Sequence, residues 1–155
     1  MWEGVPDGTT DPVATLSVFA PETMSSDGTC LTVSTPAARP RRSEVFLVDE
    51  IATLGSSASD IAGDANLPVG ALAAAGHLFA ADVNNSQVLV WEDIADALAG
   101  LSADTILGAA GVSDTQPEIS RNQVFWPAVV SFDGDYLWVG EVKFSGRLVR
   151  FSPTG

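Results

Sequence analysis

The sequence is poor in the residues that most often build chemical sites. Its 155 residues include one cysteine, Cys30, and one histidine, His77. A single cysteine cannot close a disulfide within the chain, and this pair leaves no His/Cys set for a metal. Glycine loops that cradle phosphates and the G-x-S-x-G turn of serine hydrolases are also missing. We therefore expect no catalytic residue, no cofactor and no metal ligand in this chain.

Basic residues are also scarce. Lysine and arginine number 7 against 20 aspartates and glutamates, for a formal net charge of −13, and neither basic type occurs between Ser43 and Ser120. Nucleic-acid affinity depends on cations that neutralise phosphates, so no nucleic-acid partner is expected. Anionic membrane surfaces are disfavoured for the same reason. The acidic residues either keep the protein soluble or attract a cation or a basic partner. Their spacing in the sequence does not identify a particular site.

Long hydrophobic runs are absent too. The longest apolar stretch, about 67–75, is interrupted by Pro68 and Gly70 and falls short of the ~20 residues that span a bilayer. Met1–Gly4 begins neither a basic nor an apolar segment, so we expect no signal peptide and no membrane insertion. The compartment stays unassigned, because secretion or periplasmic export would need a leader encoded upstream of Met1.

What the sequence does contain is a series of short strand-like segments. They are rich in β-branched and aromatic residues and are separated by Gly, Asp, Asn or Ser. A single segment has helical spacing instead, with Ile94, Leu98 and Leu101 on one face and Asp93 as N-cap, which predicts one short helix at about 93–101. The expected strands include 78–81, 87–91, 129–132, 136–139 and 147–151.

These segments recur as a unit. Three copies, with cores at about 20–48, 67–91 and 126–151, run from a proline or its neighbour through three strands joined by turns. A fourth short segment, an aspartate followed by small or apolar residues, accompanies them at 11–16, 58–63 and 102–108. Four strands per unit with a period of roughly 45 residues are typical of the blades of a β-propeller.

The repeat resembles the NHL-repeat family of β-propellers. The resemblance is closest over 67–91, where Phe79-Ala80-Ala81-Asp82-Val83-Asn84-Asn85-Ser86-Gln87-Val88-Leu89-Val90-Trp91 nearly follows the family's strand, Ala-Asp, Asn-turn, strand pattern. Gln87 and Glu44 stand where the family has arginine, and Glu141 follows Gly140 where Ala-Asp is usual. The resemblance implies an all-β fold with about three four-stranded antiparallel blades in an incomplete ring and one short helix between blades.

This resemblance implies a binding or scaffold module for a protein or a small ligand. Related six-bladed propellers include lyases and lactonases that hold a metal in the central channel, which is the alternative. One histidine and three blades do not supply such a ligand set, so we favour binding. Three blades are also fewer than the four to eight of closed propellers, so further blades are expected from a longer chain, which we favour, or from a second copy.

Individual residues are assigned structural roles. Asp82 is expected to accept hydrogen bonds from the backbone of the Asn84-Asn85 turn, so that Asp82→Ala destabilises by about 1–3 kcal/mol. The D-x-N-x-S run from Asp82 resembles the start of a calcium loop, but Gln87 occupies the place that needs glycine. Cys30 and His77 are expected in a strand and a turn. Asp133 and Gly134 are assigned to a tight turn, and Trp91, Trp126, Trp138 and Phe151 to packing between blades.

Overall fold

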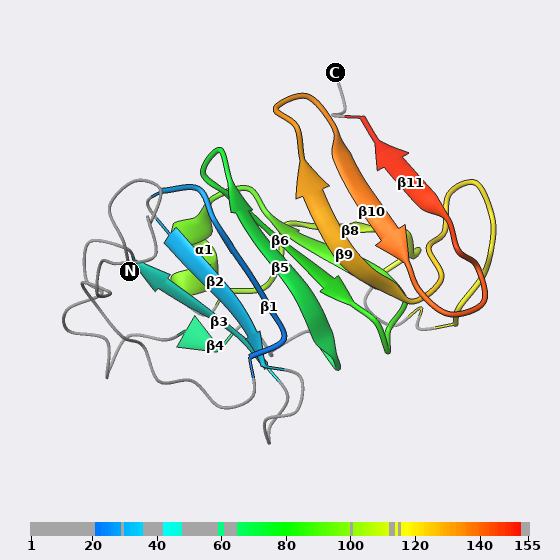
Figure 1. Ribbon diagram of the computed structural model, residues 1–155, viewed down its shortest axis with the longest axis horizontal. Helices are drawn as coiled ribbons and strands as arrows, with labels where there is room; N and C mark the ends of the chain where they lie inside the picture. The colour runs from blue at the N-terminus through cyan, green and yellow to red at the C-terminus, as the bar shows by residue number, and fades with distance from the viewer. Residues whose placement is uncertain are drawn as a thin grey trace, which may run out of the picture.

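The residues that the structure describes form three antiparallel β-sheets (Figure 1). The computed structural model describes residues 21–28, 30–35, 42–47, 59–60, 65–99, 101–111, 114 and 116–152. The first sheet contains β1 (Thr23–Ser26), β2 (Cys30–Thr35), β3 (Arg42–Leu47) and β4 (Ser59–Asp60). The second contains β5 (Pro68–Ala74), β6 (His77–Asp82), β7 (Gln87–Trp91) and β8 (Thr105–Leu107), and the third contains β9 (Pro127–Phe132), β10 (Leu137–Glu141) and β11 (Leu148–Phe151).

Each sheet is a meander in which consecutive strands are neighbours. Over the described ranges, the predicted antiparallel β-structure with one short helix is therefore confirmed. That helix, α1 (Ile94–Leu98), joins β7 to β8, and the Asp93 carboxylate caps it by accepting from the Ala95 N–H at 2.8 Å. Of the fourth segments expected at 58–63 and 102–108, residues 59–60 form the edge strand β4 and residues 105–107 form the edge strand β8. The strand expected at 11–16 lies outside the described residues.

The second sheet lies between the other two. β1 and β2 contact β5 on one side, and β9 contacts β5 and β6 on the other. Side chains alternate between the two faces along β6 and β7, as in any strand. Leu78, Ala80, Leu89 and Trp91 form one apolar cluster with α1, while Phe79 and Val88 form a second cluster with Leu137 and Val139 of the third sheet.

The strands at the centre of the stack approach one another closely. A Cβ atom built on Gly70 of β5 would collide with the backbone carbonyl oxygen of Ala128 of β9. Toward the first sheet, the hydroxyls of Ser25 and Thr32 each donate to the Ala71 carbonyl at 3.0 Å. Glycine and small hydroxyl residues thus allow β5 to lie against both neighbouring sheets.

Within the described ranges, no helix has the length and apolar character needed to cross a bilayer.

Candidate functional site

A fully buried carboxylate fixes the chain that enters the second sheet. Asp82 has a relative exposure of 0% and accepts hydrogen bonds from the backbone N–H groups of Asn66 and Leu67, both at 2.8 Å. The Asn85 side-chain amide donates to it at 2.7 Å. The Asn66 and Leu67 N–H groups are donors that the sequence did not predict, and Asn85 of the expected turn donates through its side chain. Asp82 is the register partner of Pro68, which places its carboxylate beside the residues that precede β5.

Glu141 occupies the equivalent position in the third sheet. It is the register partner of Pro127, is 7% exposed, and accepts the Phe125 N–H at 2.9 Å. Arg147 pairs with the same carboxylate, with Nε 2.8 Å from Oε2 and Nη2 2.6 Å from Oε1. Glu141 departs from the repeat pattern in the sequence. Its carboxylate nevertheless binds the backbone of the segment before β9, as Asp82 binds the segment before β5.

Electrostatics keep this pair charged. Burial by itself raises the pKa of Glu141, but hydrogen bonds from Arg147 and Phe125 and the arginine's charge outweigh it and lower that pKa. The same pairing raises the pKa of Arg147. Arg147 also donates to the carbonyls of Ser120 at 2.7 Å and Gln123 at 3.0 Å. The guanidinium therefore holds the segment before β9 as well as Glu141.

Gln87 of the second sheet occupies the position equivalent to Arg147 of the third sheet, but its side chain makes no corresponding hydrogen bond to the carboxylate. It is the register partner of Asp82 and has a relative exposure of 0%. Neither its side-chain nitrogen nor its oxygen has a hydrogen-bond partner among the described residues, and the same holds for the Ser86 hydroxyl beside it. A buried amide without partners is costly, because it loses its hydration and gains nothing in return.

A partly exposed aromatic cluster lies next to the Glu141 anchor. It comprises Phe125, Trp126 and Phe144, whose rings follow one another at centroid distances of 4.8 and 5.7 Å. Lys143 Nζ lies 4.1 Å from the centroid of the Trp126 ring, and Phe144 is 80% exposed. Trp126 and Lys143 have positive φ angles of 47° and 62°, which side chains of this size rarely adopt.

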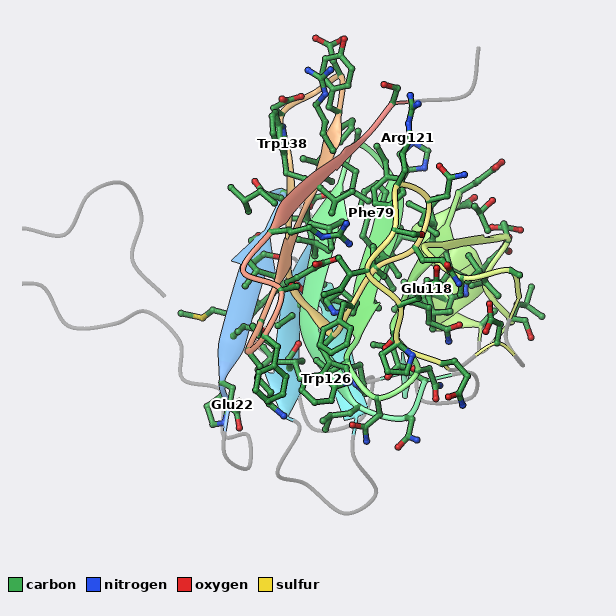
Figure 2. The ribbon with its side chains drawn as sticks, turned by 90° about the vertical axis from the view of Figure 1, so that its right-hand side faces the viewer. Glu22, Phe79, Glu118, Arg121, Trp126 and Trp138 are labelled. Carbon is green, nitrogen blue, oxygen red and sulfur yellow. The ribbon has the colours of Figure 1, made fainter. Side chains whose placement is uncertain are left out.

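The sequence drew attention to Trp126 alone among these residues. Phe125, Lys143 and Phe144 were missed, although Lys143 and Phe144 lie in the turn between two strands, where an exposed aromatic residue signals an interaction surface. Trp126 itself lies in this cluster, close to the β10–β11 turn. Figure 2 shows Trp126 and Trp138 at opposite ends of the third sheet.

The other aromatic residues assigned to packing occupy three environments. Trp91 is buried in the apolar cluster with α1 and donates its indole N–H to the Leu101 carbonyl at 2.8 Å. Phe151 packs between the second and third sheets. Trp138 is 37% exposed on the outer face of the third sheet, and its indole N–H donates to Asp133 at 2.7 Å.

Asp133 and Gly134 lie between β9 and β10. Gly134 has a φ of 106°, and Asp133 accepts the N–H groups of Asp135 and Tyr136 at 3.0 and 2.8 Å. The Trp138 hydrogen bond, followed by those backbone bonds, lowers the pKa of Asp133. Asn84 lies in the β6–β7 turn and donates its amide to the Asn66 side chain at 3.2 Å.

The described side chains bring together no evident ligand set for a metal. No group of three or more His, Cys, Asp or Glu residues among them is arranged to hold an ion. His77 begins β6, with its ring 6.0 Å from that of Phe79. Cys30 is the first residue of β2, and its side chain is not among those that the structure describes. No protein-family model matches the chain, and no curated protein matches its sequence.

Proposed function

We propose that the three sheets are blades of a β-propeller of the NHL-repeat type and that the chain acts as a binding module. The sheets support this through equivalent residues. Asp82 and Glu141 each accept the N–H of the residue two positions before a proline, Asn66 and Phe125, and Val83 N–H and Val142 N–H each donate at 3.1 Å to the residue directly before that proline. Two sheets with one hydrogen-bonding pattern are typical of a structural repeat.

The outer face of the third sheet supports the presence of further blades. Phe79 and Val88 of the second sheet, 6% and 0% exposed, are covered by the third sheet. The equivalent positions in the third sheet are Trp138 and Leu148, which are 37% and 77% exposed. Apolar residues on a sheet face favour packing on another sheet. We therefore propose that another blade, from a longer chain or a second copy, covers this face.

The aromatic cluster of Phe125, Trp126 and Phe144 is the observation that carries the binding function. Phe144 is exposed and Phe125 and Trp126 are half-buried, while the Glu141–Arg147 pair fixes the backbone on either side. Exposed aromatic side chains on rigid turns supply contact area at small entropic cost, and exposed aromatic clusters mark interaction sites. We assign this cluster as the surface that takes a protein or small-molecule ligand.

An array of immobilised peptides and glycans tests this assignment. We expect the wild-type protein to bind a defined subset of probes and Phe144→Ala to lose that subset. Met24→Ala is the matched control, because Met24 is similarly exposed, at 76% against 80%, but lies on the first sheet. Identical binding profiles for wild type and Phe144→Ala would contradict the assignment.

The enzyme alternative, a propeller lyase or lactonase with a channel metal, makes a different prediction. Nothing among the described side chains favours it. Metal analysis of the purified protein, followed by a lactonase and lyase screen, separates the two functions. Stoichiometric, tightly held Ca²⁺ or Zn²⁺ together with turnover would replace the binding proposal.

A further inference from the structure

A pocket of about 380 Å³ lies between the second and third sheets. Its lining residues His77, Gly134 and Asp135 place it by the β5–β6 and β9–β10 turns. Figure 1 shows both turns at the end of the strands opposite to the β10–β11 turn, where Phe144 of the aromatic cluster lies. Its apolar wall comes from both sheets and consists of Phe79, Val90, Leu107, Phe132, Leu137 and Phe151. The pocket is therefore a second candidate site, separate from the surface assigned above.

The corresponding place on the other face of the second sheet is filled by α1. The helix contacts β6 and β7 of its own sheet and β4 of the first sheet. Ile94 and Leu98 pack against the apolar cluster that includes Leu78 and Trp91. The Ile94 N–H donates to the carbonyl of Gly76, in the β5–β6 turn, at 2.8 Å. A short amphipathic helix thus closes the space between the first and second sheets.

The pocket between the second and third sheets occupies the position that is equivalent to the binding position of α1 between the first and second sheets. Leu137 and Phe151, in its wall, are the equivalents of Leu78 and Trp91, because Glu141 and Arg147 align with Asp82 and Gln87 in their sheets. From these equivalent positions we infer that the pocket is a docking site for a short amphipathic helix of a partner polypeptide. The helix inserts apolar side chains spaced i, i+3 and i+4, as Ile94, Ala97 and Leu98 do in α1.

The charges at the mouth of the pocket define the partner further. Glu92 and Asp135 line it, and both are exposed. The polar side chains of His77 and Thr105 also line the pocket. With a net charge of −13 on the whole chain, the surrounding field also attracts cations. The partner helix therefore carries lysine or arginine beside its apolar face.

Fluorescence anisotropy with a labelled, helix-stabilised peptide tests this inference. The probe has the sequence of residues 92–101 with Glu92→Lys and Asp96→Lys, which keeps Asp93 as N-cap and makes the polar face basic. One control peptide keeps the native acidic residues, and a second adds Ile94→Asn and Leu98→Asn to the basic probe. We expect the basic probe to bind, and each control to bind at least about tenfold more weakly, because each loses charge attraction or apolar burial.

Two protein variants locate the binding. Leu107→Asn removes an apolar wall residue, and Leu101→Asn is its control, since Leu101 is 56% exposed and does not line the pocket. Asp135→Lys reverses a charge at the mouth, and Asp114→Lys makes the same net change elsewhere. We expect about tenfold weaker binding for Leu107→Asn, severalfold weaker binding for Asp135→Lys, and little change for either control.

The inference fails if the basic probe does not bind, if the acidic peptide binds equally well, or if Leu107→Asn and Asp135→Lys leave its binding unchanged. Circular dichroism of each variant must match that of the wild type, and any variant that loses its β-sheet signal is replaced by Val90→Asn at the same wall. Because Phe144 lies away from this pocket, Phe144→Ala leaves probe binding unchanged. Failure of the aromatic surface and failure of this pocket are therefore told apart.

Discussion

Removing the Asp82 carboxylate tests the anchor on which the second sheet depends. In Asp82→Ala, the N–H groups of Asn66 and Leu67 lose an acceptor at 2.8 Å, and the Asn85 amide loses one at 2.7 Å. Hydrogen bonds to a charged group contribute about 1.5–3 kcal/mol each, and water compensates part of the loss at the exposed Asn66. We expect the free energy of unfolding to fall by about 2–4 kcal/mol.

The assay is chemical denaturation followed by circular dichroism, with Asp114→Ala as control. Asp114 accepts one exposed hydrogen bond, from the Ala110 N–H at 3.1 Å, so its removal should cost less than about 1 kcal/mol. Asp82→Asn retains one acceptor oxygen and should lie between wild type and Asp82→Ala. Equal losses for Asp82→Ala and Asp114→Ala would refute the reasoning, because burial and number of donors would then have no effect.

Three further predictions concern the neighbouring anchors and the centre of the stack. The lowered pKa of Glu141 means that its charge stabilises the fold above the unfolded value of 4.5 and that this contribution is lost as the pH falls through the folded value. Glu141→Gln should therefore lower stability at pH 7 and flatten its decline below about pH 5 in denaturation series; parallel curves would contradict this. Gln87→Met should raise the free energy of unfolding by about 1 kcal/mol, because it removes a buried amide that has no hydrogen-bond partner in the described part of the chain, and a lower denaturant midpoint would show that the amide is paired. Gly70→Ala should cost about 1–3 kcal/mol through its collision with the Ala128 carbonyl, whereas Gly140→Ala, whose nearest neighbour would be 3.5 Å away, should cost less than about 1 kcal/mol in thermal denaturation; equal costs would contradict the close approach of β5 and β9.

Local patterns in the sequence predicted the elements well. Short runs rich in β-branched and aromatic residues, bounded by turn residues, identified β6 and β7, and the Ile94–Leu98 spacing with Asp93 as cap identified α1. These signals are local, because each strand or helix must turn one face toward the core. The fourth strands were found through the repeat, since β8 is too short to be recognised by its own periodicity.

Contacts between distant residues were harder to predict. The Asp82 carboxylate was expected to accept hydrogen bonds from its own turn, and the Asn85 side chain of that turn does donate to it. Cross-strand register with Pro68 also brings it to the N–H groups of Asn66 and Leu67, which were not expected. Nothing local in the sequence reveals that Glu141 repeats this anchor with the help of Arg147. Register and side-chain reach decide such contacts, and both depend on the assembled sheet.

The aromatic cluster shows the same limit. Lys143 lies over Trp126 only because the β10–β11 turn returns to the segment before β9. Composition identifies tryptophan as a candidate for burial, which does not distinguish a core position from a turn position. The pocket was likewise invisible in sequence, because its walls come from two sheets.

The molar mass of the isolated chain, measured by multi-angle light scattering, tests the central claim most directly. If the sheets are blades whose stack continues beyond the third sheet, the face with Trp138 and Leu148 needs a cover, and the chain alone should self-associate above its single-chain mass of 16.1 kDa. Leu148→Lys, which places a charge on this face, should reduce that association. A stable, monodisperse monomer of the wild-type chain would contradict the proposed stack of blades.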